Sequence, residues 1–319
     1  MKTVDLKFLS QKICDAKRIL IAGHKNPDGD SLCSVLALAQ LIKLNFSKDA
    51  VCAYDGNIPD MLDNMPMRNE MQYYAHIDAG TPFDLVFILD YGTKNHIGGV
   101  MPFVKSARYV IEIDHHNNCD LIGDLAFCDD SSAATGEIIF NIANKLKWTR
   151  DATVNDLLAA SVLTDTGFFK YVRRGRVLRM MADLVDAGVD IEKISNALNN
   201  KPRKTVLTEA GVVSRAEFFY HGRLALAIID EHDYKNLDGR GEMVLSLLGQ
   251  IKGVEYVALL KRQKEMQTGV SLRGKTMPVD EIAAKLGGGG HTYAAGAVVA
   301  DSLENVRTRV LELFRGAKK

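Results

Sequence analysis

The chain has 319 residues, of which 47% are hydrophobic and 25% charged, and this ordinary globular composition excludes a disordered, collagenous or fibrous protein. Its length exceeds that of a usual single domain, so we expect two domains with a core each. Lysine plus arginine and aspartate plus glutamate both number 40, which gives a net charge of zero. Such a balance argues against binding of long duplex nucleic acid through many phosphates.

No uncharged stretch is long enough to cross a bilayer, and the first ten residues lack the apolar core of a signal peptide. We therefore expect a cytoplasmic protein that does not bind membranes. The chain has five cysteines without a CxxC pair, namely Cys14, Cys33, Cys52, Cys119 and Cys128. In a reducing compartment this odd number favours free thiols over a disulfide framework.

The N-terminal part alternates short apolar runs with helical periodicity. The runs are RILIAG at 18–23, AVCAY at 50–54, DLVFILD at 84–90 and ARYVIEID at 107–114. Strands with little polar alternation, separated by helices, are typical of a parallel sheet buried on both faces. From residue 132 to about 200 the pattern is helical. The sequence thus predicts a doubly wound, mainly parallel α/β domain over residues 1–198, with helices on both faces.

A proline and three positive charges in NNKPRKT predict a linker at 199–205. Residues 206–319 form a smaller α+β pattern. Its expected elements are a helix at 207–219, a strand at 224–230, a helix near 240–251, strands at 254–263 and 266–274, a helix at 279–287, a strand at 294–300 and a final helix.

Charge differs between the two predicted domains. Residues 1–200 hold 21 Lys+Arg against 26 Asp+Glu, whereas residues 201–319 hold 19 against 14. An acidic half suits cation binding and a basic half suits anion binding. We therefore expect the first domain to bind cations and the second to bind anions, with closure of the cleft between them at the linker.

Potential ligands follow three of the predicted strands. His24 follows the first run, Asp90 ends the third, and Asp114, His115 and His116 end the fourth. Binding sites of open parallel sheets form outside the carboxyl ends of the strands. At one strand alone, a turn aspartate or a structural histidine is the more common explanation. Three strands that deliver such side chains to one edge indicate a site.

The loop HKNPDGDS places Asn26, Asp28 and Asp30 at alternate positions, as in a calcium-binding loop. The sixth position of that loop requires glycine and the twelfth a glutamate, but this chain has Ser31 and Ala37 there. A calcium loop of this type is therefore excluded. Ser31 is instead expected to cap a following helix.

Two further segments carry candidate residues. Asp165 follows the apolar helix LLAASVLT, where by itself an ordinary helix-end residue is an equally good explanation. In the second domain, the glycine run 287–290 precedes His291 and exceeds what a helix C-cap needs. Backbone amides of such a run can approach a phosphate closely, although a hinge is the alternative. Arg273, at the end of a predicted strand, offers a planar fork suited to phosphate.

Taken together, HKNPDGD, LDYGT, DHH and LTDTG, followed much later by LGGGGH, resemble the motifs of the DHH/DHHA1 phosphoesterase family. The resemblance covers nearly the whole chain, and LDYGT is its loosest match. Within the family, the two-domain size is most similar to the branch of oligoribonucleases (nano-RNases) and 3'-phosphoadenosine-5'-phosphate phosphatases. The larger RecJ exonucleases share the core but carry further domains.

The resemblance implies two divalent ions, usually manganese. It assigns His24, Asp28 and Asp90 to one ion. It assigns Asp30, Asp90, His115 and Asp165 to the other, with Asp90 as the bridge. The implied catalytic residues are Asp90, His115 and His116.

The resemblance also implies roles around the ions. His116 would face the substrate phosphate, and Asp114 would orient the imidazoles. In the second domain, the implied phosphate-binding residues are Arg273, Gly288, Gly289, Gly290 and His291.

This inventory is chemically coherent. The carboxylates of Asp28, Asp30, Asp90 and Asp165 balance the charge of two divalent cations. Ions roughly 3.5 to 4 Å apart can share a water as a bridging hydroxide and stabilise both the attacking and the leaving oxygen, so no protein nucleophile is required. Imidazole and carboxylate ligands without thiolate favour manganese over zinc, while magnesium, iron and cobalt stay open.

The expected function is hydrolysis of short oligonucleotides to 5'-mononucleotides, and of 3'-phosphoadenosine-5'-phosphate to AMP. The alternatives are a linear or cyclic dinucleotide phosphodiesterase (pApA or c-di-AMP type), an inorganic pyrophosphatase, and a nucleotide-binding regulator without turnover. GGGGH with SLRG resembles the nucleotide-handling type and argues against pyrophosphatase. The expected partners are short oligonucleotides or small nucleotides, and a homodimer is one candidate assembly.

Overall fold

The computed structural model describes residues 3–116, 120–172, 174–237 and 241–316. The chain forms two compact units, Met1–Asn200 and Lys201–Lys319, which are described separately below. The domain limits expected from the sequence stay predictions, and so does a free thiol at Cys119, which lies outside the described residues. Across the described chain, no helix is long and apolar enough to span a membrane.

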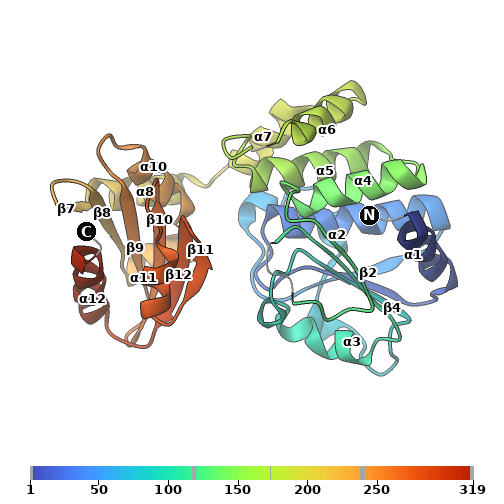
Figure 1. Ribbon diagram of the computed structural model, residues 1–319, viewed down its shortest axis with the longest axis horizontal. Coiled ribbons are helices and arrows are strands. Elements are labelled where there is room, and N and C mark those ends of the chain that lie inside the picture. The colour runs from blue at the N-terminus through green and yellow to red at the C-terminus, as the bar shows by residue number, and fades with distance from the viewer. Residues whose placement is uncertain (1–2, 117–119, 173, 238–240, 317–319) are drawn as a thin grey trace. The chain divides into compact units, whose positions relative to one another are not determined.

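The first unit contains a six-stranded sheet in the order β3-β2-β1-β4-β5-β6, in which all neighbouring strands are parallel (Figure 1). The strands are β1 (Ile19–Ala22), β2 (Ala50–Tyr54), β3 (Met71–Tyr73), β4 (Leu85–Leu89), β5 (Val110–Asp114) and β6 (Leu125–Cys128). The strand order reverses between β1 and β4, which is the switch point where open α/β sheets bind ligands. The predicted doubly wound parallel sheet is confirmed.

Both faces of this sheet are buried. In β1, Ile19 and Ile21 belong to one core, and Leu20 and Ala22 to another, because successive side chains point to opposite faces. Four helices cover the first face (Figure 1): α1 (Thr3–Asp15), α2 (Gly29–Phe46), α4 (Thr135–Leu146) and α5 (Ala152–Asp165). On the other face lie short 3₁₀ turns and α3 (Met101–Ser106).

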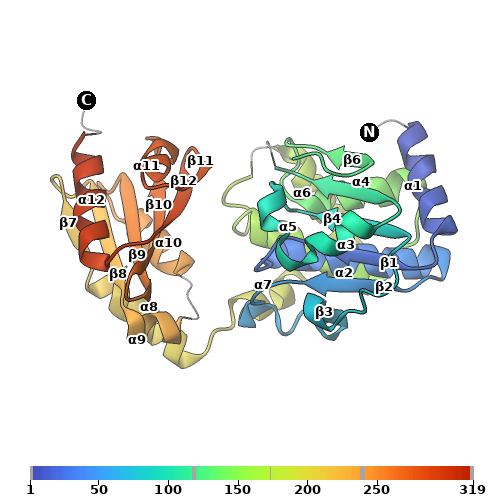
Figure 2. The same cartoon turned by 90° about the horizontal axis from the view of Figure 1, so that it is seen from below.

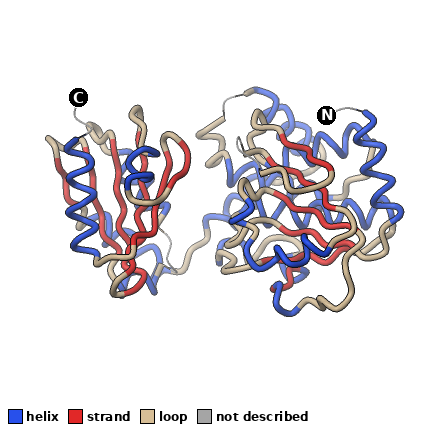
Figure 3. Tube along the Cα trace, turned by 60° about the horizontal axis from the view of Figure 1, so that its bottom comes forward, coloured by secondary structure: helices blue, strands red, loops and turns tan. Residues whose placement is uncertain are grey.

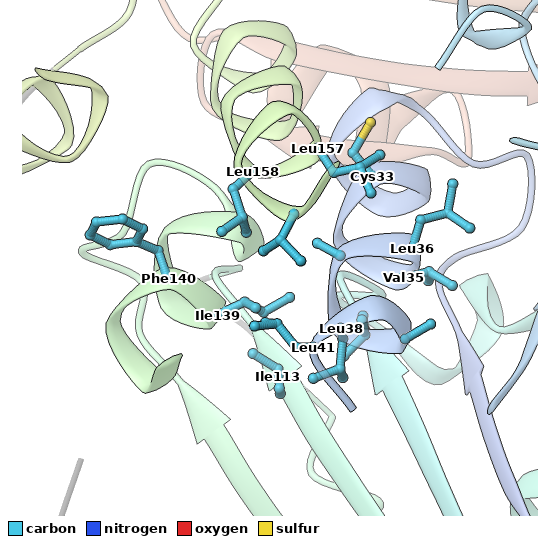
Figure 4. Packing of buried hydrophobic residues seen from close by; sticks show 14 of the residues in the cluster. Cys33, Val35, Leu36, Leu38, Leu41, Ile113, Ile139, Phe140, Leu157 and Leu158 are labelled. Atoms are coloured by element: carbon cyan, nitrogen blue, oxygen red, sulfur yellow. The ribbon is translucent and has the colours of Figure 1, made fainter. Parts of the chain in front are cut away.

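The centre of the larger core is the contact of α2 with α4 and α5, shown in Figure 4. Leu36 and Leu41 of α2, Ile139 of α4 and Leu157 of α5 are buried there. α2 is apolar on nearly all sides, as expected for a helix that neighbours and a sheet enclose. The unit is completed by α6 (Gly175–Asp186) and α7 (Ile191–Asn199), whose apolar residues join the same core.

The second unit has a six-stranded mixed sheet in the order β11-β12-β10-β9-β8-β7 (Figures 2 and 3). Of its described pairs, β8 and β9 are parallel and the others antiparallel. The strands are β7 (Glu217–Phe219), β8 (Leu224–Ile229), β9 (Tyr256–Lys264), β10 (Gln267–Gly274), β11 (Gly289–His291) and β12 (Ala294–Val299). The expected α+β architecture is confirmed.

Helices line both faces of this second sheet. One core includes residues of α8 (Arg203–Ser214) and α10 (Glu242–Gln250), beside which lies α9 (Glu231–Asn236). The other includes residues of α11 (Asp280–Lys285) and α12 (Leu303–Gly316). The helix predicted over 207–219 is wrong at its end, because β7 begins at Glu217 and pairs with β8.

Candidate metal centre

The loop HKNPDGDS connects β1 to α2, and α2 begins earlier than expected. Asp28 caps the helix, since its Oδ1 accepts the N–H of Ser31 (3.0 Å). The prediction of Ser31 as the cap is therefore wrong; its hydroxyl instead accepts the N–H of His24 (3.1 Å). These two bonds close the loop on itself. As a result, Nε2 of His24 lies 3.6 Å from Oδ1 of Asp28.

The ring of His24 is oriented by the backbone. Its Nδ1 lies 2.9 Å from the carbonyl oxygen of Lys25. Because a carbonyl oxygen can only accept a hydrogen bond, Nδ1 carries a proton and donates it. Nε2 therefore faces Asp28 and the Oδ2 of Asp90, which is 3.8 Å away. Metal-binding histidines are commonly held in this way, with one nitrogen on a carbonyl and the other on the ion.

Asp90 lies at the centre of the cluster. It directly follows β4 and its side chain is buried, and its φ of 53° lies in the left-handed region, which is rare for a residue other than glycine. Its N–H donates to the carbonyl oxygen of Ile113 (3.0 Å). Oδ2 faces His24 at 3.8 Å, and Oδ1 lies 3.4 Å from Nε2 of His115. Each carboxylate oxygen thus faces a different histidine.

A second group of side chains surrounds His115. Its Nε2 lies 3.4 Å from Oδ2 of Asp165, the last residue of α5, and 3.8 Å from Oδ2 of Asp30. The ligand atoms of Asp30, His115 and Asp165 all lie within 4.8 Å of one another, and so do those of His24, Asp28 and Asp90. The structure therefore brings all six predicted metal ligands together. A further group of this kind joins Asp90, His115 and His116.

Asp30 is held by three helices. Its carboxylate accepts the backbone N–H groups of Thr135 (2.7 Å) and Gly136 (3.2 Å), where α4 begins. It also accepts the hydroxyls of Ser34 on α2 (3.0 Å) and Ser161 on α5. These supporting residues were not predicted from the sequence. Hydroxyls within otherwise apolar helices were the only available signal for Ser34 and Ser161.

Asp114 and His116 form a second unit of the site. Oδ2 of Asp114 accepts the N–H groups of Tyr91 (3.0 Å) and Gly92 (2.7 Å), and Oδ1 accepts the N–H (2.9 Å) and Nδ1–H (2.7 Å) of His116. Burial alone would raise the pKa of Asp114, but the donors of His116 and Gly92 lower it to about 2. Asp114 is thus a fixed anion that holds His116 and the turn after Asp90.

The pKa values of the cluster depend on its burial and charge. Loss of water and the charge of Asp30 raise the pKa of Asp90 to about 7, although His115 opposes this. Burial would lower the pKa of His24, but Asp28 and Asp90 overcome it and raise it to about 10. The pKa of His115 is raised to about 10 against burial by Asp90 and Asp30. Without a cation, the cluster therefore retains protons.

The donor set fits hard or borderline divalent cations. Four carboxylates and two imidazoles, without a thiolate among the clustered ligand atoms, suit manganese or magnesium better than a zinc site built on cysteine. The buried carboxylates that repel one another are a second indication, because a bound cation would replace the protons that they retain.

The predicted phosphate-binding residues lie in the second unit. Arg273 belongs to β10, and pairing places it on the same sheet face as Ser271, Gly269 and Gly296. Its Nη1 donates to the carbonyl oxygen of Leu272 (3.0 Å), and within the described part of the chain no carboxylate forms an ion pair with its guanidinium. This arginine therefore borders a strip of very small side chains.

The glycine run is a strand in part and not only a loop. Gly289–His291 is the edge strand β11, which pairs with β12. A Cβ at Gly288 would lie 2.0 Å from the carbonyl oxygen of Gly296, whereas one at Gly289 would meet nothing within 4 Å. Close packing against β12 is therefore sufficient to explain why position 288 is a glycine. The phosphate-binding roles of Gly288, Gly289, Gly290 and His291 stay predictions.

Comparison with known proteins agrees with this geometry. Residues 18–164 match the DHH family N-terminal domain, and residues 226–317 match the DHHA1 domain. The chain is 31% identical over 302 residues to the bifunctional oligoribonuclease and PAP phosphatase NrnA of Thermus thermophilus, covering 93% of this chain and 89% of that protein. A more distant relative is the cyclic-di-AMP phosphodiesterase GdpP of Geobacillus thermodenitrificans, 22% identical over 97% of this chain and 50% of that protein.

Among solved structures, an exopolyphosphatase-related protein from Bacteroides fragilis has the same fold, with a TM-score of 0.89 and 21% identity over 99% of this chain and 96% of that one. The match over residues 18–164 includes the ends of β1, β4 and β5 and the start of α2, which carry candidate ligands of the cluster. The chain therefore belongs to the DHH family, in the branch of DHH–DHHA1 phosphoesterases to which the NrnA oligoribonucleases and PAP phosphatases belong.

Proposed function

We propose that this protein is a manganese-dependent phosphoesterase with two ions, which hydrolyses short oligonucleotides to 5'-mononucleotides and 3'-phosphoadenosine-5'-phosphate to AMP. The observation that carries the proposal is the cluster of six ligands with Asp90 between two histidines. The similarity to NrnA over 93% of the chain supports the choice of substrates.

In this proposal, divalent ions held by the cluster would activate water and neutralise phosphate charge. Asp90 would bind both ions, because each of its oxygens faces one of the two ligand groups. The hydrogen bond of His116 to Asp114 raises the pKa of His116, which favours the protonated ring. His116 could then donate a hydrogen bond to a phosphate oxygen of the substrate.

The second unit would bind the substrate through Arg273, whose guanidinium matches the geometry of a phosphate. Lys261 is a second cation on this face, since it pairs with Gly269 on the neighbouring strand. Burial and the charge of Arg273 act to lower the pKa of Lys261, although Glu242 opposes Arg273. Cations that repel each other in this way are suited to binding an anion.

A dinucleotide phosphodiesterase is the second candidate, and the relative named for cyclic-di-AMP hydrolysis favours it. It would use the same metal cluster, so only the substrate decides between the two. The assay compares turnover of a dinucleotide, a longer oligonucleotide, 3'-phosphoadenosine-5'-phosphate, cyclic-di-AMP and pyrophosphate with manganese present. We expect the dinucleotide and the adenosine bisphosphate to be preferred. Preference for pyrophosphate, or no turnover of a phosphoester, would refute the proposal.

The site itself is tested by Asp90→Ala and Asp90→Asn. Both variants remove the bridge between the ligand groups, so we expect less than about 1% of the wild-type kcat/KM, a loss of more than ~2.7 kcal/mol of transition-state stabilisation. The folded state should survive, because Asp90 is a repelled charge in the metal-free protein. Circular dichroism would show whether the fold is retained, and the shift of Tm by manganese would show whether metal binding is lost.

Asp84→Asn is a matched control at the opposite end of β4. Asp84 accepts the N–H groups of Lys17 and Arg18 (2.9 Å each), far along the strand from the cluster. We expect this control to retain activity and its response to manganese. Near-normal activity of the Asp90 variants would exclude the two-ion assignment.

A further inference from the structure

The segment after α5, which follows the candidate ligand Asp165, exposes two aromatic side chains. Tyr171 is 63% exposed and Phe168 37% exposed, and they follow Asp165 by six and three residues. Neither side chain has a part in the mechanism above. Exposed aromatic groups beside a site are a common means of ligand contact, since they bring a large apolar area at little loss of conformational freedom.

This segment is a strained turn with fixed hydrogen bonds. Three consecutive residues are left-handed, Gly167 (φ 56°), Phe168 (φ 55°) and Phe169 (φ 68°), although bulky residues rarely adopt this conformation. The N–H of Phe168 donates to the carbonyl oxygen of Leu163 (2.8 Å), and that of Tyr171 to the carbonyl oxygen of Thr166 (3.0 Å). Strain of this kind is found mainly at functional sites. Here it holds Phe168 outside while Phe169 packs against the core.

The two rings lie within reach of a nucleotide bound at the cluster. The ring of Tyr171 packs against Gly167, where an added Cβ would lie 3.0 Å from it, and Gly167 is two residues from Asp165. Because Phe168 is three residues after Asp165, the Cα atoms of the two residues are at most roughly 11 Å apart. Lys170 adds a positive charge here, with its Nζ 5.1 Å from the centre of the Tyr171 ring.

We propose that Tyr171, together with Phe168, is the stacking surface for a nucleobase of the substrate whose phosphate reacts at the metal cluster. This inference rests on the proposed function and names the part of the substrate that the first unit contacts. Stacking on an aromatic ring tolerates every base, because each base has a π-face. It therefore suits an enzyme that degrades short oligonucleotides of mixed sequence.

The test compares binding of AMP and of ribose 5-phosphate, which lacks the base, by calorimetry with manganese present. We expect the wild-type chain to bind AMP on the order of tenfold more tightly. Tyr171→Ala and Tyr171→Leu should bring the two affinities together, whereas Tyr171→Phe should keep them apart. Affinity for ribose 5-phosphate should not change in any of these variants.

Two further variants separate stacking from effects on the fold. Phe168→Gly removes the second ring and also relieves a left-handed position, so we expect a smaller preference for AMP together with a native circular dichroism spectrum. Phe8→Ala is the matched control. Phe8 is 41% exposed on α1 and contacts Tyr109, just before β5 and so at the edge of the sheet opposite the cluster. We expect this control to bind AMP as the wild type does.

Three results would overturn the inference: equal wild-type affinities for AMP and ribose 5-phosphate, equal weakening of both ligands by Tyr171→Ala, or a change of oligomeric state with unchanged affinities. The last result would identify the surface as a protein contact. A wild-type preference for AMP that Tyr171→Ala abolishes, without turnover of any phosphoester, would support stacking and refute only the proposed function.

Discussion

At the scale of single residues, the cluster buries carboxylates and imidazoles close together, and their pKa values are shifted in the absence of a cation. Asp90 is 2% exposed and has its pKa raised to about 7 by burial and by Asp30. His24 and His115, whose pKa values are near 10, carry a proton on the nitrogen that faces the carboxylates. A metal ion must displace these protons in order to bind.

This displacement predicts a pH-dependent response to metal. The folded pKa of Asp90 lies above its ordinary value of 3.8, so its contribution to stability is lost as pH rises toward about 7. Those of His24 and His115 lie above 6.5, so their contribution is complete below 6.5 and is lost as pH rises toward about 10. The metal-free protein should therefore lose stability with rising pH, and the gain from manganese should grow.

The measurement is thermal unfolding with EDTA or with manganese between about pH 6 and pH 8, where Asp90 in the folded chain and the two histidines in the unfolded chain lose protons. Calorimetry in buffers of different ionisation enthalpy would count the protons released on binding. An equal shift of Tm by manganese at both ends of this range, without proton release, would contradict the prediction.

At the scale of elements, the site depends on how closely α2 approaches α5. Gly29 begins α2 between Asp28 and Asp30, and a Cβ there would lie 2.3 Å from the Thr164 side chain of α5. Because Asp165 follows Thr164, the same contact sets the spacing between the carboxylates of the two helices. A glycine is thus required for the close approach and not for an unusual φ angle.

Gly29→Ala should separate the two helices. We expect a loss of about 1–3 kcal/mol in the free energy of unfolding from overpacking, together with weaker manganese binding. Gly175→Ala is the control, since a Cβ added at Gly175 would lie 3.4 Å from its nearest neighbour, the flexible end of the Arg179 side chain. Urea unfolding and calorimetric titration would measure both quantities. A Gly29→Ala variant with the stability and metal affinity of the control would show that the contact is unimportant.

The start of α4 depends on an ion pair from α6. Nε of Arg176 lies 2.6 Å from Oε1 of Glu137, which is 2% exposed, and its Nη2 lies 3.1 Å from Oδ2 of Asp129. Arg176→Ala would leave the buried carboxylate without its cation, so we expect a loss of about 1–3 kcal/mol. Because the N–H of Thr135 in this turn supports Asp30, activity should fall as well.

Arg179→Ala on the same helix is the matched control for Arg176. Arg179 is exposed, and its replacement should change the free energy of unfolding by less than about 0.5 kcal/mol. Chemical denaturation would measure the free energy of unfolding of both variants. If they lose the same amount, the ion pair with Glu137 does not stabilise the turn.

At the scale of the whole molecule, the chain consists of two units that each have a sheet buried on both faces. All six candidate metal ligands belong to the first unit, whereas Arg273 and the glycine run belong to the second. Because each unit has its own hydrophobic cores, we expect each to fold alone. Metal binding and hydrolysis of nucleotides should therefore be separable.

A fragment of residues 1–200 should keep the stabilisation by manganese and lose hydrolysis of the dinucleotide, because the proposed phosphate ligands are missing. Differential scanning calorimetry would report the first property and a chromatographic assay the second. Full activity of the fragment would refute the proposed role of the second unit, whereas loss of the response to manganese would show that the cluster needs both units.

The sequence by itself determined the parallel sheet and the place of the candidate ligands. Short apolar runs without polar alternation, separated by helical segments, are typical of strands buried on both faces, and parallel strands present their carboxyl ends at one edge. His24, Asp90 and His115 follow three such strands, so their proximity follows from topology. Strands of three residues, β3, β7 and β11, were not predicted, because so short a segment carries no periodic pattern and is defined by its pairing partner.

Only the tertiary structure decided what holds the ligands in place. Ser34, Thr135 and Ser161 come from three helices and meet at Asp30, and no local pattern indicates such a meeting. Arg176 of α6 forms an ion pair with the buried Glu137 of α4, and no pattern in the sequence links these two positions. Hydrogen bonds and charges act over a few ångströms in space, irrespective of separation along the chain, and so this support appears only once the chain is folded.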